Sequence, residues 1–234
     1  MNLIKNKSKF SAERAGKQPA HERVYENLRD LILFGELAPG QAVTIQGLTD
    51  SLGAGMTPVR EAIRRLISDG ALVFQGNRRV SVPQLRHGDV EELIFLRKSV
   101  ESELTRRAAE RMTSADIDKL EAIDTTLDAS IEAGDVVGYL AHNYAFHTML
   151  YGYADAPIMH DLVGRLWLRF GPSLRVVCGR FGTENLPDRH KDVLAALRKK
   201  DTEALVKAIV QDIEQGMDLM SEMLGKGVED TDPD

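Results

Sequence analysis

The sequence has little cysteine and no long apolar stretch, and both absences restrict what kind of protein it encodes. Cys178 is the single cysteine, so the chain cannot form an intramolecular disulfide. Because a protein without disulfides suits a reducing compartment, we expect a cytoplasmic location. No apolar run approaches the roughly 20 residues of a membrane-spanning helix, and the first residues lack a signal-peptide pattern. We therefore expect no membrane partner.

Acidic residues outnumber basic ones, but the two signs are unevenly distributed along the chain. The 234 residues carry a formal net charge of −6 at pH 7. Residues 1–83 contain 12 Lys and Arg against 8 Asp and Glu, whereas residues 84–234 contain 18 against 28. The first part therefore has a charge of +4 and the second a charge of −10. This asymmetry favours one domain that binds nucleic acid and one that does not.

Residues 44–66 predict two short helices joined by a tight turn. Their apolar stripes are formed by Ile45, Leu48, Leu52, Val59, Ile63 and Leu66. Gly53 lies where the chain must turn, and we expect Thr57 to cap the second helix with Pro58 in its first turn. The exposed face of the second helix would keep Arg60, Arg64 and Arg65. A second helix that presents arginines is typical of a helix-turn-helix recognition element.

The flanking segments extend this pattern to a winged helix. Residues 22–34 form an amphipathic helix, and residues 71–74 and 79–83 read as two strands of a wing with a basic tip. We therefore predict a DNA-binding domain over residues 20–83, preceded by a flexible arm at residues 1–19. The candidate DNA contacts are Gln46, Thr57, Arg60, Arg64, Asn77, Arg78 and Arg79. The alternative is a small helical domain whose arginines are merely solvated.

The same segment resembles the GntR family of bacterial transcription regulators. The resemblance rests on Gly-Glu-Leu-Ala-Pro-Gly at residues 35–40, Thr-Pro-Val-Arg-Glu-Ala-Ile-Arg-Arg-Leu at residues 57–66, and Asp69-Gly70. It implies a double-stranded DNA operator and a homodimer that reads two half-sites, with repression as the commoner role in the family. Gly55 and Met56 stand where the family usually has serine and arginine, so the operator sequence cannot be carried over from relatives.

Residues 88–225 predict an all-α antiparallel bundle, which makes the whole fold mostly α with a small β wing. Six amphipathic helices are expected at residues 89–111, 113–134, 135–151, 157–177, 186–199 and 202–224. An acidic tail follows at residues 226–234. Within the bundle, Asn143 and His147 are four residues apart and so project from one face of a helix. Taken alone, this spacing is weak evidence for a site, because a lone histidine on such a helix is more often a hydrogen-bonded structural residue or a surface residue.

The bundle resembles the ligand-sensing FCD domain of the FadR-type GntR subgroup. Asn-Tyr-Ala-Phe-His at residues 143–147 and the segment that begins at His190 match two of its motifs, and Asp212 stands where the family has a histidine. The resemblance implies a divalent metal, such as Zn²⁺, Ni²⁺ or Mn²⁺, and an organic-acid effector. The implied metal ligands are Asn143, His147, His190 and Asp212, and the implied effector contacts are Arg97, Asn143, His147 and His190.

Alternatives to the metal-bound sensor stay open at this point. One is a metal-free polar pocket that hydrogen-bonds the effector directly, and another is a helical module that binds a protein partner. Arg97 could pair with an effector carboxylate or, along its own helix, with Glu101. A metal-dependent hydrolase is a remote alternative, because the chain has no His-Glu-x-x-His motif, nucleophile elbow or phosphate loop. We expect no enzyme activity.

Overall fold

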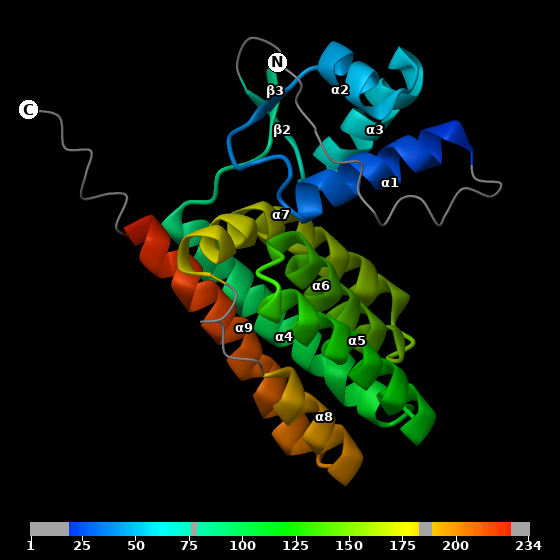
Figure 1. Cartoon of the computed structure of the whole chain (residues 1–234), viewed down its shortest axis with the longest axis vertical. Coiled ribbons are helices and arrows are strands. Elements are labelled where there is room, and N and C mark those ends of the chain that lie inside the picture. The colour runs from blue at the N-terminus through cyan, green and yellow to red at the C-terminus, as the bar shows by residue number, and fades with distance from the viewer. Residues whose placement is uncertain (1–18, 76–78, 183–188, 226–234) are drawn as a thin grey trace, which may run out of the picture. The chain divides into compact units, whose positions relative to one another are not determined.

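The computed structural model describes residues 19–75, 79–182 and 189–225, except for the side chains of Phe181 and Gly225. Within these residues the protein is mostly α-helical, with one small sheet, as the sequence predicts. The described chain forms two compact units (Figure 1). The first contains residues up to Leu85 together with Trp167–Ser173, and the second contains Arg86–Leu166 and the residues from Leu174 onward.

The first unit is a winged helix. Its helices are α1 (Ala20–Leu33), α2 (Ile45–Leu52) and α3 (Met56–Ser68). Its strands are β1 (Ala42–Val43), β2 (Val73–Gln75) and β3 (Arg79–Ser81), in the antiparallel order β1-β3-β2. The hairpin predicted from the sequence therefore gains a third strand. Two-residue β1 is too short to give a recognisable alternating pattern.

The core of the first unit lies between α1 and α3. Each helix turns one apolar face toward the other, and the fully buried side chains include Leu28, Ile32, Val59 and Leu66. These positions recur at helical spacing, which is why the periodicity of the sequence located both helices correctly. Ala71 and Leu72, predicted to open the wing strand, lie before β2 and are completely buried. They anchor the base of the wing in the core.

The turn between α2 and α3 differs in one detail from the prediction. Thr44 caps α2 by accepting a hydrogen bond from the Gly47 amide at 3.0 Å, and Gly53 ends the helix with a φ of 62°. The prediction that Thr57 caps α3 is wrong, because the N-cap is Gly55 and Thr57 already lies inside the first turn. A capping side chain needs extended backbone at its own residue, which Gly55 has and a helical residue lacks.

The second unit is a bundle of α-helices (Figure 1). Its members are α4 (His87–Ala109), α5 (Ser114–Glu132), α6 (Val136–Gly152), α7 (Pro157–Phe181), α8 (His190–Lys199) and α9 (Thr202–Gly225), with Trp167–Ser173 of α7 counted in the first unit. α4 packs along α9, α5 packs along α6, and α8 lies against both α5 and α9. The fully buried Leu104, Leu120, Phe146 and Ile209 belong to its core. Among the described residues, no helix is both long and apolar enough to cross a membrane.

Gly53 offers a test of the helix-turn-helix geometry. A Cβ atom added at Gly53 would have no neighbour within 4 Å, so the effect of a substitution comes from its left-handed backbone alone. We expect Gly53→Ala to lower the free energy of unfolding in urea by about 1–2 kcal/mol. Gly53→Asn should lower it less, because asparagine tolerates this conformation. Equal stability of Gly53→Ala and the wild type would contradict the turn described here.

Candidate functional site

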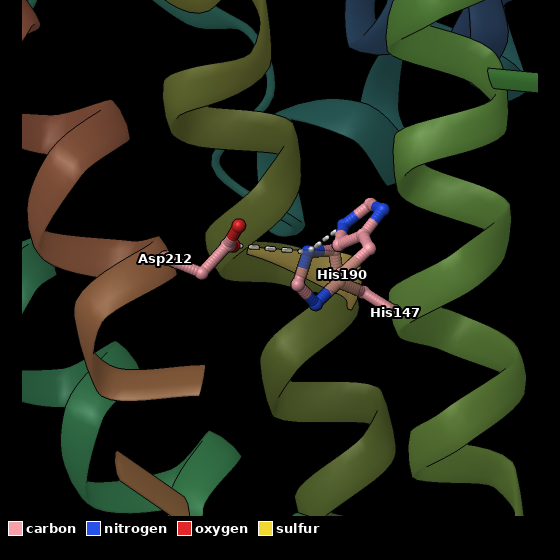
Figure 2. Close-up of side chains that lie close together, drawn as sticks. All are labelled: His147, His190 and Asp212. Atoms are coloured by element: carbon pink, nitrogen blue, oxygen red, sulfur yellow. Dashed lines mark hydrogen bonds and ion pairs between the residues drawn. The ribbon is translucent and has the colours of Figure 1, made fainter. Parts of the chain in front are cut away.

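Three potential metal ligands from three helices meet inside the second unit (Figure 2). His147 comes from α6, His190 is the first residue of α8, and Asp212 comes from α9. The Nε2 atom of His147 lies 3.1 Å from Oδ2 of Asp212 and 3.3 Å from Nε2 of His190. The ligand atoms of all three residues lie within 4.8 Å of one another. The fold thus closes sequence separations of 43 and 22 residues.

The two histidines are held by groups on their opposite ring nitrogens. Nδ1 of His147 lies 3.1 Å from the Tyr151 hydroxyl, and Nδ1 of His190 lies 3.1 Å from Oδ1 of Asp124. The His190 ring also stacks on Phe146, with ring centroids 3.8 Å apart. Because each ring is fixed on several sides, both Nε2 atoms are directed into the same small space.

The carboxylate of Asp212 is ionised under ordinary conditions. Burial alone would raise its pKa, but His147, His190 and Arg97 outweigh that effect and lower the pKa of Asp212 to about 2. The pKa of Asp124 is also lowered: burial raises it, but His190 and Lys191 lower it by more. The site therefore contains charged oxygen atoms beside two imidazoles, which is a donor set that fits a divalent transition metal.

The remaining predicted ligand is Asn143, which lies one helical turn before His147 on α6 and is buried. Its position on the same face as His147 agrees with the four-residue spacing. The described cluster consists of His147, His190 and Asp212, so participation of the Asn143 amide stays a prediction.

Arg97 is occupied by an acidic neighbour on its own helix. Its Nε and Nη2 atoms lie 2.6 and 3.2 Å from the two oxygens of Glu101, and both side chains are buried. Burial disfavours the charged guanidinium, but Glu101 raises the pKa of Arg97 overall. An effector carboxylate at Arg97 would therefore have to share the guanidinium with Glu101.

Sequence reasoning did not assign roles to Asp124 and Tyr151. Asp124 is a buried acid on the apolar side of α5, where Leu120 and Leu127 lie one turn away on either side. A single acid among apolar neighbours was the available signal, since a buried charge needs a partner. Tyr151 lies four residues after His147, but tyrosine in an apolar helix is commonly just core. Only the folded chain identifies their partners.

The candidate DNA-binding residues lie on α2, α3 and the wing. Thr57, Arg60 and Arg64 are exposed along α3, and Arg79 is exposed at the start of β3. Gln46 is exposed on α2, where its amide donates to Asp50 at 2.8 Å. Asn77 and Arg78, predicted at the tip of the wing, lie outside the described residues.

Arg65 differs from the other two arginines of α3. Its guanidinium carbon lies 3.6 Å from the centroid of the Tyr25 ring, and Nη1 lies 3.1 Å from Glu22. Arg65 therefore helps to join α3 to α1. Among the described residues of α3, Arg60 and Arg64 are the arginines that stay available to contact another molecule.

Comparison with known proteins identifies both units. The family described as FCD domain matches residues 92–215, and that described as bacterial regulatory proteins, gntR family, matches residues 20–82. The HTH-type transcriptional regulator McbR of Escherichia coli (strain K12) is 27% identical over 201 residues, which cover 85% of this chain and 91% of that protein. The HTH-type transcriptional repressor RspR of the same strain is 26% identical, covering 85% and 87%.

Solved structures show the same likeness. The structure of E. coli McbR/YncC has a TM-score of 0.83 at 25% identity, and the match covers 88% of this chain and 99% of that one. A GntR transcriptional regulator from Rhodococcus sp. RHA1 has a TM-score of 0.71 at 23% identity, covering 88% and 97%. At 23% identity, the match to the Rhodococcus structure is evidence for the fold alone.

Proposed function

The chain belongs to the GntR family of bacterial regulatory proteins and contains an FCD domain, and we propose that it senses a small organic acid through a divalent metal. It is a transcription regulator with a DNA-binding helix-turn-helix domain. The observation that carries the sensing proposal is the meeting of His147, His190 and Asp212. The RspR relative is named a repressor, and repression is the role we propose for this chain.

The donor set supports a metal at this site. Two imidazole nitrogens and one carboxylate oxygen suit Zn²⁺, Ni²⁺ or Mn²⁺ better than the oxygen-preferring Mg²⁺ or Ca²⁺. A bound ion would act as a Lewis acid and attract an anionic ligand. Three protein donors leave coordination positions free, which Asn143 and an effector carboxylate could fill. In the proposed site, His147, His190 and Asp212 hold the ion.

A metal-free pocket is the alternative that a specific observation favours. Buried Arg97 is linked to His147 through hydrogen bonds of Glu101 and Tyr151, so a guanidinium lies near the cluster. An organic acid could then be held by hydrogen bonds from Arg97, Asn143 and the histidines without an ion. The hydrolase alternative has less support, because the curated relatives are transcription regulators.

Regulation requires the effector to favour one arrangement of two DNA readers. We propose a cytoplasmic homodimer in which residues 20–83 of each copy read one half-site and residues 88–225 bind the effector. Apart from Pro19, the predicted arm at residues 1–19 and the predicted tail at residues 226–234 lie outside the described residues. A ligand with equal affinity for both arrangements would change nothing, so the effector must bind one of them better.

The metal content of the purified protein tests the site directly. We expect protein prepared without chelator to contain about one divalent ion per chain, and the His147→Ala/His190→Ala variant to contain almost none, because it loses both imidazole ligands. His142→Ala/His160→Ala is a matched control that removes two histidines outside the cluster. Equal metal content in the cluster variant and the control would eliminate the metal site. Effector binding by metal-free wild type would favour the alternative pocket.

Arg60 tests the recognition helix. We expect Arg60→Ala to weaken binding to DNA selected by the wild type by about 1–3 kcal/mol, since a side chain that contacts a base edge contributes this much discrimination. Binding to unrelated DNA should change less. Arg106→Ala removes a positive charge from α4 and serves as the control. Undiminished affinity of a folded Arg60→Ala protein for the selected DNA would refute the placement.

The wing is tested by salt dependence. If Arg78 and Arg79 contact phosphates, the double alanine variant should bind all DNA sequences more weakly. The slope of log K against log salt concentration should become shallower by about one to two units. Fluorescence anisotropy over a series of salt concentrations measures this slope. A slope identical to that of the wild type would mean that the wing does not touch the DNA backbone.

A further inference from the structure

We propose that Tyr151 and Asp124 are positioning residues that keep a proton on Nδ1 of His147 and of His190, so that the Nε2 atoms of the neutral rings direct their lone pairs into the space shared with Asp212. This inference concerns the proposed metal site and rests on the proposed metal-binding function. The proton positions themselves follow from the hydrogen bonds around the cluster. They can therefore be measured whether or not a metal binds.

Glu101 acts only as a hydrogen-bond acceptor. Its carboxylate receives two hydrogen bonds from the Arg97 guanidinium, at 2.6 and 3.2 Å, in a fully buried setting. A guanidinium has only donors, and it contacts both oxygens of this carboxylate, so both oxygens accept hydrogen bonds from it. Any group that makes a hydrogen bond to Glu101 must supply the hydrogen.

Glu101 fixes the position of the Tyr151 hydroxyl proton. The Tyr151 hydroxyl oxygen lies 2.6 Å from Oε2 of Glu101, so its single hydrogen is donated there. The same oxygen lies 3.1 Å from Nδ1 of His147 and has no second hydrogen to give. It must accept in that contact, which requires a hydrogen on Nδ1 of His147. Nε2 of the neutral ring then carries the lone pair.

His190 is oriented in the same way by Asp124 of α5. Its Nδ1 faces Oδ1 of Asp124 at 3.1 Å, and the other oxygen of that carboxylate receives Lys191. Because the lysine ammonium occupies Oδ2 and the carboxylate can only accept, Nδ1 of His190 must donate. Nε2 of His190 therefore also carries a lone pair when the ring is neutral. Two residues on two different helices produce the same tautomer in both rings.

The consequence is an arrangement that needs a positive charge at its centre. Nε2 of His147 lies 3.1 Å from Oδ2 of Asp212 and 3.3 Å from Nε2 of His190, and all three atoms would be acceptors. A shared proton or a metal ion relieves the repulsion between them. Outer residues that orient histidine ligands in this way typically change metal affinity about 10–100-fold when they are replaced.

Nitrogen NMR of histidine-labelled, chelator-treated full-length protein reads the proton positions directly. We expect the Nδ1 resonances of His147 and His190 to have the chemical shift of protonated ring nitrogens. The resonances are assigned with His147→Gln and His190→Gln. An unprotonated Nδ1 on either ring would overturn the proposal for that ring. This measurement gives an answer even if the wild type binds no metal.

Two near-isosteric variants supply the second readout. Tyr151→Phe deletes the acceptor for His147 and should weaken Zn²⁺ binding about 10–100-fold. In Asp124→Asn the lysine would retain the side-chain oxygen and turn the amide NH₂ toward His190. The Nδ1 atom of His190 should then lose its proton, with a loss of Zn²⁺ affinity of similar size. Circular dichroism and melting temperature verify that each variant is folded.

Matched controls lie close by. Tyr153→Phe removes a tyrosine whose hydroxyl donates to Asp116 at 2.8 Å, and Asp128→Asn removes the other carboxylate that binds Lys191, at 2.7 Å. Both should retain wild-type Zn²⁺ affinity and histidine shifts. If the wild type binds Zn²⁺ and Tyr151→Phe and Asp124→Asn bind it as tightly, the proposal fails and the metal site stands. If no Zn²⁺ binds but both Nδ1 atoms are protonated, the metal function fails and the positioning roles stand.

Discussion

A continuous chain of buried polar contacts constrains the helical unit more than any other interaction. It runs from Arg97 and Glu101 on α4 through Tyr151 and His147 on α6 to Asp212 on α9. From His147 it continues to His190 and Lys191 on α8 and to Asp124 on α5. Five helices therefore share one network. A partly satisfied buried network is worse than an apolar core, so every member depends on the placement of the others.

The network favours a negative charge at Asp212, the residue that stands where the family resemblance implies a histidine. A neutral imidazole at the position of Asp212 would not have the Coulomb attraction to Arg97 that the carboxylate has. As a ligand, the anionic carboxylate of Asp212 would also reduce the positive charge of a bound divalent ion more than an imidazole would. Whether a metal or a proton occupies the centre, the aspartate makes a cation there more favourable.

Periodicity was sufficient to predict the mostly α fold, the winged helix and the helices of the bundle, because apolar spacing reflects burial on one face. It was not sufficient for β1, which spans two residues, or for the cap of α3, where the residue before Thr57 already begins the helix. Resemblance to a family supplied His147, His190 and Asp212. Asp124 was missed because its contact with His190 joins residues 66 positions apart, and Tyr151 was missed because a tyrosine in an apolar helix is commonly part of the core.

The arginines of α3 also show that the sequence does not reveal contacts between distant residues. Helical spacing places Arg60, Arg64 and Arg65 near one exposed face, and all three are indeed exposed. The sequence does not reveal that Tyr25 and Glu22 of α1 hold Arg65. Because that guanidinium is already engaged, moving it to a phosphate would break contacts between α1 and α3. Packing against α1, a helix more than 30 residues earlier in the chain, therefore decides which of these arginines is structural and which stay available.

The shared network also indicates how a small ligand could act on a whole domain. An ion or organic acid at His147, His190 and Asp212 would contact α6, α8 and α9 at once, and through Tyr151 and Asp124 its effect would reach α4 and α5. Densely packed helices respond by small shifts between discrete arrangements, since a close-packed interior is not continuously deformable. A ligand that prefers one such arrangement changes the population of the entire bundle. A buried polar cluster shared by five helices is thus better suited to regulation than a binding site on one surface helix.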